Sequence, residues 1–182
     1  MQIVEESPLK DCIIISPKIF HDERGCFFES FNKKQFEELT GQSIDFVQDN
    51  QSHSSKGVLR GLHFQKGKYG QAKLLRVIKG SVQDVVVDLR PESSTFGNYY
   101  STILSEKNNK QIFVPRGFAH GFLTLEDNTI INYKCDNYYH KESESGIIYN
   151  DKQLQINWKK INVDYVLSQK DLELSIFENL QL

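Results

Sequence analysis

The chain has 182 residues, a formal net charge of −2 and a sequence pI of about 6.2. This length fits one domain with an ordinary core, and the charge excludes the global basic field that would hold a nucleic acid. No segment approaches the ~18 apolar residues that a membrane span needs, and the N-terminus lacks the basic region and apolar run of a signal peptide. We therefore expect a cytoplasmic protein with neither a nucleic-acid nor a membrane partner.

Strand-like segments recur along the whole chain. The composition includes 12 Phe and 8 Tyr, and aromatic residues fit the pleated surface of a sheet well. Turn residues separate the segments at strand-sized spacing, which is typical of a sandwich or barrel. We expect strands at residues 12–16, 26–31, 58–64, 73–80, 82–90, 99–105, 111–115, 121–125 and 129–135.

Two helices are expected beside these strands. Asn32 predicts the start of a helix over residues 33–41, with Gly41 as its terminator. Apolar residues at helical spacing predict a second helix over residues 168–180. No glycine-rich strand-to-helix unit interrupts the strands, so the sequence favours antiparallel β-structure with peripheral helices over a doubly wound fold.

Candidate metal ligands do not form a convincing set. Pro115, Gly117 and His120 form a P-x-G-x-x-H pattern, which resembles the second motif of cupins; the alternative is a β-turn followed by a half-buried histidine. The companion motif would need two histidines as H-x-H and a nearby glutamate, but only His63 stands at that place, followed by Phe64. The cysteines lack C-x-x-C spacing, and they are Cys12, Cys26 and Cys135. We therefore expect no metal.

Several motifs together carry a resemblance to one family. The segments stand in the expected order and cover most of the chain. The segments are HDERGCFFESF (21–31), FVQDNQSHSSKGVLRGLHFQ (46–65), KLLRVIKGSVQDVVVDLRPESSTFG (73–97), LSEKNNKQIFVPRGFAHGF (104–122) and YKCDNYYHKESESGIIYND (133–151). With these segments, the chain resembles the dTDP-4-dehydrorhamnose 3,5-epimerase family.

The resemblance implies a fold and an activity. The fold is a single antiparallel cupin (jelly-roll) barrel over residues 1–182, with an N-terminal strand region at about 1–45, the barrel at about 46–150 and a helical tail at about 160–182. The protein would be a homodimer without metal or cofactor. Its substrate would be the dTDP-4-keto-6-deoxyhexose dTDP-4-dehydro-6-deoxy-D-glucose, and its product dTDP-4-dehydro-L-rhamnose.

The chemistry makes simple demands on the site. A 4-keto group acidifies the protons on carbons 3 and 5, so inversion needs a base on one face, an acid on the other and a group that stabilises the enolate. The resemblance implies that His63 is the base, Tyr133 the acid and Lys73 the cation near the keto oxygen. Structural alternatives are a strand histidine that only hydrogen-bonds, a half-buried tyrosine and a lysine at a strand end.

Two carboxylates have assignments that need a partner. Asp171 matches the carboxylate that orients the catalytic histidine in the family, although Ser168 and Asp171 also form a capping-box pattern at the start of a helix. Asp84 interrupts an apolar run and would need a partner if it points inward. Lys73 is the candidate partner for Asp84.

The remaining candidates are substrate contacts implied by the resemblance. Arginine and lysine suit phosphate oxygens, and amides, carboxylates and tyrosine suit sugar hydroxyls and the base. Each of these polar residues could instead satisfy a turn or cap. The phosphate candidates are Arg24, Arg60 and Lys170; the others are Glu29, Gln48, Asp49, Asn50, His120, Tyr138 and Glu144. In a dimer, Arg24 and Glu29 would reach across to the neighbouring chain.

The segment 46–65 is polar for a strand because it would line a wet, substrate-filled barrel. Arg60 and His63 are three residues apart and would face opposite sides of a regular strand. Glycine within a strand often marks a bulge that shifts this alternation. We therefore predict an irregularity near Gly61.

Three further hypotheses remain open on the sequence alone. A relative that inverts only carbon 3 or only carbon 5 would carry almost the same residues. A metal-dependent cupin is disfavoured by the missing ligands. A non-catalytic sugar-nucleotide-binding module is disfavoured because His63, Lys73 and Tyr133 occur together.

Overall fold

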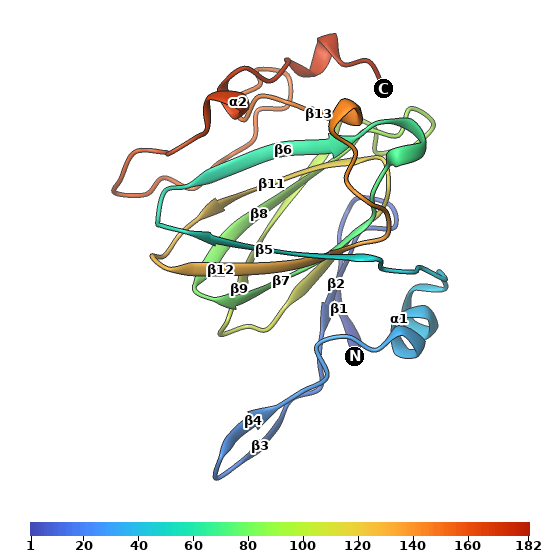
Figure 1. Cartoon of the computed structure of the whole chain (residues 1–182), viewed down its shortest axis with the longest axis vertical. Helices are drawn as coiled ribbons and strands as arrows, with labels where there is room; N and C mark the ends of the chain where they lie inside the picture. The colour runs from blue at the N-terminus through green and yellow to red at the C-terminus, as the bar shows by residue number, and fades with distance from the viewer.

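The computed structural model describes the backbone of residues 1–182 and all side chains except those of residues 3–6. Two antiparallel sheets face each other and form a barrel (Figure 1), which confirms the predicted fold class. The first sheet has six strands in the order β1 (Gln2–Glu6), β2 (Ile13–Ser16), β10 (Gln111–Val114), β7 (Lys73–Lys79), β12 (Thr129–Cys135) and β5 (Gln48–Ser54). The second has five strands in the order β13 (Glu144–Gly146), β6 (Leu59–Gln65), β11 (Phe118–Thr124), β8 (Ser81–Asp88) and β9 (Tyr99–Ser105).

The polar segment 46–65 forms two strands rather than one. β5 pairs with β12 in the six-stranded sheet, and β6 pairs with β11 in the five-stranded sheet. The chain therefore crosses from one sheet to the other between them (Figure 1). This crossing gives both sheets polar side chains from one stretch of sequence.

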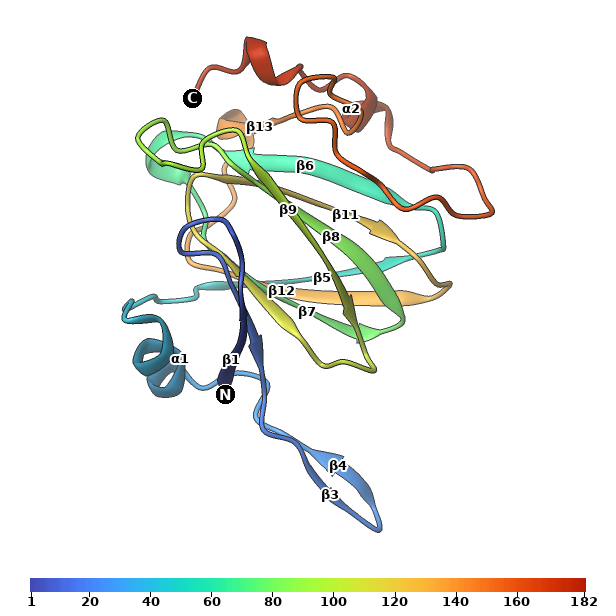
Figure 2. The same ribbon diagram turned by 180° about the vertical axis from the view of Figure 1, so that it is seen from behind.

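The N-terminal segment joins the barrel and also leaves it. β2 pairs with β10, so this segment extends the six-stranded sheet. A hairpin of β3 (Phe20–Asp22) and β4 (Gly25–Phe27) projects away from both sheets in Figures 1 and 2. The strand expected at 26–31 ends at Phe27, because Glu29 and Ser30 instead hydrogen-bond side chains of the following helix and of β10.

β8 is buried on both of its faces. Val82 and Val86 pack into the core between the two sheets, while Val85 and Val87 pack under the C-terminal segment together with Trp158. A strand covered on both sides carries a continuous apolar run instead of an alternation. Burial on both faces therefore explains the unbroken apolar run from Val85 to Val87 in β8.

The predicted first helix is confirmed as α1 (Lys33–Thr40). The Asn32 side chain accepts a hydrogen bond from Gln35 N, and Gly41 has a left-handed φ of 67°. Phe36 is fully buried and packs edge-on against Phe113 of β10. α1 therefore covers part of the outer face of the six-stranded sheet.

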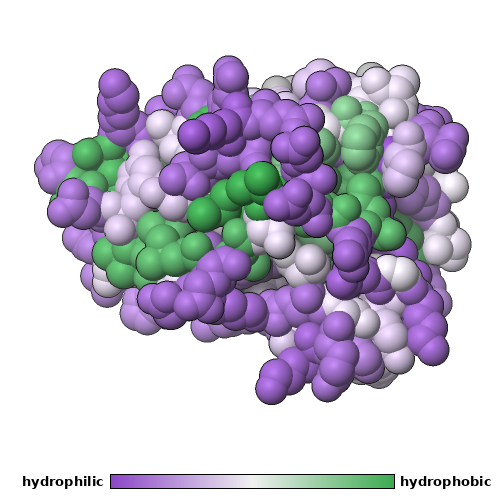
Figure 3. Space-filling view, turned by 90° about the horizontal axis from the view of Figure 1, so that it is seen from above, coloured by the Kyte–Doolittle hydropathy of each residue, from purple (hydrophilic) through white to green (hydrophobic). Residues whose placement is uncertain are grey.

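The predicted second helix is wrong beyond its first turn. Only α2 (Gln169–Leu172) is α-helical, followed by a 3-10 turn, η3 (Phe177–Asn179). Between them Ser175 forms a bridge with Ile147, so contacts with the barrel pull the chain out of the helix. Apolar side chains remain exposed on this tail, and Figure 3, which looks down on it, shows apolar surface among polar side chains.

Two short 3-10 turns lie at the rim of the barrel, η1 (Gly67–Tyr69) and η2 (Lys141–Ser143). The rings of Tyr69 and His140 stack 3.7 Å apart between their centroids, which ties these two turns together. No helix among the described residues has the length and apolar character to cross a membrane.

Candidate active site

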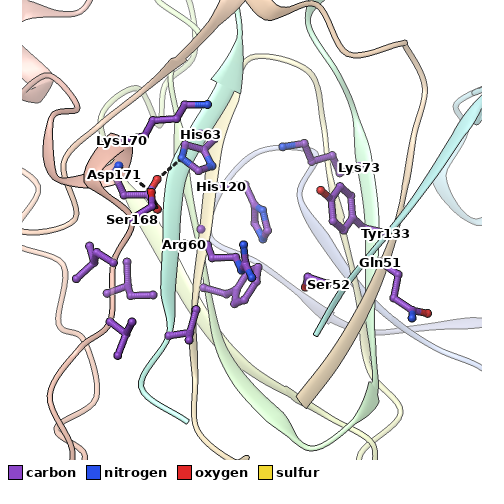
Figure 4. Close-up of a pocket in the computed structure, with 16 residues that line it drawn as sticks. Gln51, Ser52, Arg60, His63, Lys73, His120, Tyr133, Ser168, Lys170 and Asp171 are labelled. Atoms are coloured by element: carbon purple, nitrogen blue, oxygen red, sulfur yellow. Dashed lines mark hydrogen bonds and ion pairs between the residues drawn. The ribbon is translucent and has the colours of Figure 1, made fainter. Parts of the chain in front are cut away.

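A cavity of about 650 Å³ opens between the two sheets and the C-terminal tail (Figure 4). The five-stranded sheet contributes side chains from β6 and β11, the six-stranded sheet from β5, β7 and β12, and the tail from α2. The structure thus brings together most of the candidates predicted as catalytic or phosphate-binding, and one of the other predicted substrate contacts, His120. The catalytic and phosphate candidates in the cavity are His63, Lys73, Tyr133, Asp171, Arg60 and Lys170.

The predicted irregularity near Gly61 is confirmed. His63 stands opposite His120 and Arg60 opposite Phe122, so three steps on β6 match two on β11. Gly61 has a φ of +106°, a conformation open to glycine but not to most residues. The shift lets Arg60 and His63 line the same cavity although they are three residues apart.

His63 is held by a carboxylate from the tail. Its Nε2 lies 2.5 Å from Asp171 Oδ1, and Ser168 Oγ donates to the other Asp171 oxygen at 2.9 Å. Asp171 N also donates to Ser168 Oγ, so the same aspartate contacts His63 and takes part in the cap of α2. Burial raises the pKa of Asp171, but the hydrogen bonds from His63 and Ser168 outweigh burial and lower it overall. The carboxylate is therefore ionised beside the imidazole.

Tyr133 and Lys73 approach the same cavity from the opposite sheet. Figure 4 shows the Tyr133 hydroxyl and the Lys73 amine directed towards the side on which His63 lies. Burial raises the pKa of Tyr133, so its phenol stays protonated. Burial lowers the pKa of Lys73, against the charges of Asp84 and Glu144, which favour its cation.

The predicted partner of Asp84 is wrong. Asp84 is almost completely buried, and its Oδ2 lies 2.9 Å from His120 Nε2. Its other oxygen, Oδ1, has no hydrogen-bond partner among the described residues. β8 and β11 are neighbours, which brings the carboxylate to His120, whereas Lys73 acts on it only through its charge.

A second cavity of about 320 Å³ adjoins the first and shares His63, Lys73 and Tyr133 with it. Gln48 and Asn50 of β5 line it, as expected from the sequence, and so does Glu144. Glu144 Oε2 accepts a hydrogen bond from Tyr139 OH at 2.7 Å and pairs with Lys170 Nζ at 2.5 Å.

Four residues that were predicted to contact the substrate line neither of these two cavities. Asp49 faces outward from β5, because its neighbours Gln48 and Asn50 face inward, and it pairs with Lys134 at 3.0 Å. Tyr138 is 67 % exposed and lines neither cavity. Arg24 pairs with Asp22 on the projecting hairpin, and Glu29 hydrogen-bonds Asn32 and Gln35.

Several cavity residues were not among the residues predicted from the sequence, Tyr139 and Ser52 among them. Tyr139, next to Tyr138, lines the smaller cavity; two adjacent tyrosines in the turn after a strand give no signal that separates them. Ser52 lines the larger cavity, and its buried hydroxyl has no partner among the described residues. Its position two residues after Asn50 and four after Gln48 was a usable signal, because alternate residues of a strand share a face.

Among the residues with described side chains, no three His, Cys, Asp or Glu lie close enough to hold a metal ion. Asp171 and Asp84 each take up one ring nitrogen of a histidine in the cavity. Cys12, Cys26 and Cys135 are free thiols.

The two facing sheets around a polar cavity define a cupin-like barrel. The model of the dTDP-4-dehydrorhamnose 3,5-epimerase family matches residues 6–179, and the chain belongs to this family. A dTDP-4-dehydrorhamnose 3,5-epimerase of Escherichia coli K12 is 48% identical over 177 residues, which cover 97% of this chain and 95% of that protein.

Solved structures agree with this assignment. The epimerase from Elizabethkingia anophelis NUHP1 has a TM-score of 0.94 and 54% identity, covering 98% of this chain and 97% of that one. The enzyme from Legionella pneumophila Philadelphia 1, in complex with dTDP-4-keto-L-rhamnose, has a TM-score of 0.92 and 47% identity, covering 96% of this chain and 92% of that one.

Proposed function

We propose that this chain inverts carbons 3 and 5 of dTDP-4-dehydro-6-deoxy-D-glucose and releases dTDP-4-dehydro-L-rhamnose. One observation carries the proposal. His63 and Tyr133 come from facing sheets and line the same two adjoining cavities, and Lys73 lines both cavities with them. A base on one side of a sugar ring and an acid on the other are what inversion of a carbon requires. The family of the chain supports the substrate.

The proposed mechanism assigns one task to each group. His63 takes the proton next to the keto group, and Asp171 orients its ring and stabilises the imidazolium that forms. Lys73 stabilises the negative charge that develops on the keto oxygen. Tyr133 returns a proton from the opposite side, which inverts the carbon. The keto group itself acidifies the protons, so the reaction needs neither a metal nor a redox cofactor.

The remaining cavity residues have places consistent with binding. Arg60 hydrogen-bonds only a neutral partner, Ser54 Oγ at 3.3 Å, so its charge remains available for a phosphate. Gln48 and Asn50 offer amides in the smaller cavity, and His120 offers its second ring nitrogen in the larger one. These groups would bind the nucleotide and the sugar hydroxyls.

We also propose a cytoplasmic homodimer in which Arg24 and Glu29 of one chain contact substrate bound to the other. The projecting hairpin supports this assembly: Phe20 and Phe27 stand opposite each other and are 52 % and 68 % exposed. Apolar side chains exposed together mark surfaces that another protein covers. Mixing an Arg24→Ala variant with a His63→Ala variant should restore activity if one site uses residues of both chains; two inactive variants that stay inactive when mixed would oppose it.

The test of the reaction uses heavy water. The protein is incubated with dTDP-4-dehydro-6-deoxy-D-glucose in D2O, and NMR measures deuterium at each carbon. Label at carbons 3 and 5 with formation of the L-sugar is expected. Label at one carbon alone would make the protein a single-position epimerase, and binding without any label would make it a non-catalytic module. A loss of activity on chelation, restored by a metal, would make it a metal-dependent cupin.

A further inference from the structure

An ion pair closes the rim where the two cavities meet. Lys170 of α2 lines the larger cavity, and Glu144 of β13 lines the smaller one. Their Nζ and Oε2 atoms lie 2.5 Å apart, and Tyr139 OH donates to the same oxygen at 2.7 Å. Figure 4 shows Lys170 beside His63 at this rim. The cation that the family resemblance assigns to the diphosphate is therefore already paired with a carboxylate of the protein.

The two partners differ in how firmly they are held. The Glu144 side chain is 17% exposed, its backbone pairs with Gln65 of β6, and its carboxylate is fixed by Tyr139. Burial raises the pKa of Glu144, but the hydrogen bonds from Lys170 and Tyr139 outweigh burial and lower it. The Lys170 side chain is 57% exposed and projects from a single helical turn. Glu144 is thus a fixed anion, and Lys170 is the group that is free to move.

Neither Asp171 nor Arg60 competes for the partners of the Lys170–Glu144 ion pair. Both oxygens of Asp171 are occupied, one by His63 and the other by Ser168, so Asp171 does not compete for Lys170. No described carboxylate forms an ion pair with Arg60. The larger cavity therefore presents Arg60 without a carboxylate partner, Lys170 paired with Glu144, and Lys73, whose cation the charges of Asp84 and Glu144 favour without an ion pair.

We propose that Glu144 is an internal counter-ion of Lys170, which the diphosphate of an incoming nucleotide sugar displaces. The role rests on the proposed function for the ligand, and it replaces the sequence-based expectation that Glu144 contacts the substrate. A diphosphate carries more negative charge than one carboxylate and accepts charge-assisted hydrogen bonds from lysine. When Lys170 turns to the phosphate, it leaves Glu144 with its Tyr139 hydrogen bond. The Glu144 carboxylate thus weakens the binding of diphosphate and leaves the binding of an uncharged nucleoside unchanged.

Calorimetric titration of dTDP and of thymidine tests this role without turnover. Glu144→Gln removes the charge and keeps an acceptor for Tyr139, so dTDP should bind about 2- to 5-fold more tightly, the value of a partly exposed ion pair, while thymidine is unaffected. Glu142→Gln is the matched control, because Glu142 is 76 % exposed and carries the same charge two residues away. It should not tighten dTDP binding. Lys170→Met should weaken dTDP binding, and adding Glu144→Gln to it should have no further effect.

Several outcomes would overturn the counter-ion role. They are dTDP binding no tighter in Glu144→Gln than in the wild type, equal tightening in Glu142→Gln, and parallel weakening of thymidine, which would place Glu144 on the nucleoside. A further gain from Glu144→Gln in the Lys170→Met background would also overturn it. A wild type that binds no dTDP would instead overturn the proposed function and this role with it. Thermal melting of each variant checks that it is folded.

Discussion

Asp171→Asn tests how far the tail carboxylate supports the base. Asparagine keeps an oxygen that can accept the hydrogen bond from His63 Nε2, and it keeps the shape of the side chain that Ser168 contacts. It removes the negative charge beside the imidazole and puts an NH2 group in place of the oxygen that accepts from Ser168, so Ser168 Oγ must accept there instead of donating. Asp171 is 4% exposed, so water cannot enter to stabilise the imidazolium in place of the lost carboxylate charge. We therefore expect a slower reaction in a protein that folds normally.

The magnitude follows from the kind of hydrogen bond that is lost. A hydrogen bond to a charged group contributes about 1.5–3 kcal/mol, against about 0.5–1.5 kcal/mol for a neutral one. Asparagine exchanges the charge-assisted bond for a neutral one, and the difference of about 1–1.5 kcal/mol corresponds to a roughly 5- to 13-fold fall in kcat. Proton exchange at carbons 3 and 5, followed by NMR in D2O, measures this rate. Glu173→Gln is the matched control, since Glu173 carries the same charge at the end of α2 and hydrogen-bonds Gln169 instead of His63.

Unchanged proton exchange in the Asp171→Asn variant would refute the role of this carboxylate. A folded Asp171→Asn protein that exchanges substrate protons within about twofold of the wild type would remove the carboxylate from the mechanism. Asp171 would then serve only in the cap of α2, through Ser168. A fall of equal size in Glu173→Gln would show that net charge alone is responsible.

Three further predictions test the acid, the strand irregularity and a buried carboxylate. Tyr133→Phe should lower product formation about 10²- to 10⁴-fold with an unchanged melting temperature; wild-type turnover measured by NMR would exclude the phenol. In Gly61→Ala the new Cβ would lie 2.6 Å from His120 O, so urea unfolding should show a loss of about 1–3 kcal/mol. Gly67→Ala, with φ +57° and nothing within 4 Å, should lose less, and equal losses would contradict the clash. Burial raises the pKa of Asp88, but its hydrogen bonds lower it to about 2; the resulting stability of about 2–3 kcal/mol is present above its ordinary pKa and lost as pH falls through about 2. Unfolding of the wild type and Asp88→Asn across this range should show their difference shrinking towards acid pH, and a constant difference would refute it.

Local patterns predicted the barrel because the strands carry their own signals. The strands at 99–105 and 129–135 have the same bounds in the structure, since β-branched and aromatic residues fill both segments. The apolar run at 82–90 matches β8, which is buried on both faces. Asn32 and Gly41 marked the ends of α1 through capping geometry that depends only on nearby residues.

Facing direction was harder to predict where a strand is polar throughout. In β5 both the inward and the outward residues are polar, so hydrophobicity does not distinguish Asn50 in the cavity from Asp49 on the outside. The alternation of inward and outward residues on the neighbouring strand β12 does distinguish Asn50 from Asp49. Asn50 stands opposite Tyr133 and Asp49 opposite Lys134, so a correct pairing of β5 with β12 would have separated the two. Such pairing depends on tertiary structure, which a single strand does not encode.

The C-terminal tail shows the opposite failure, in which a local pattern was overridden by contacts. Leu172 and Ile176 carry the helical spacing, yet they are 47% and 44% exposed, and Phe177 is buried instead. The N–H group of Phe177 donates to buried Asp151, and Ile148 N donates to Ser175 O. These bonds hold the tail on the five-stranded sheet in an extended conformation. Helical periodicity is a weak signal when the barrel offers backbone and side-chain partners of this kind.

The pair of His63 and Asp171 depends on the packing of the tail against the finished barrel, because the two residues are far apart in the sequence. His63 and Asp171 are 108 residues apart in sequence, and Tyr133 lies on the opposite sheet. Asp171 can reach His63 only when the tail packs on the face of β6, because Leu59 shares a buried cluster with Trp158 and Phe177 of the tail. Packing of an apolar layer outside the barrel thus fixes the polar pair inside it. The same turn of helix places Lys170 at the rim, so the tail positions both the base and the cation proposed for the diphosphate.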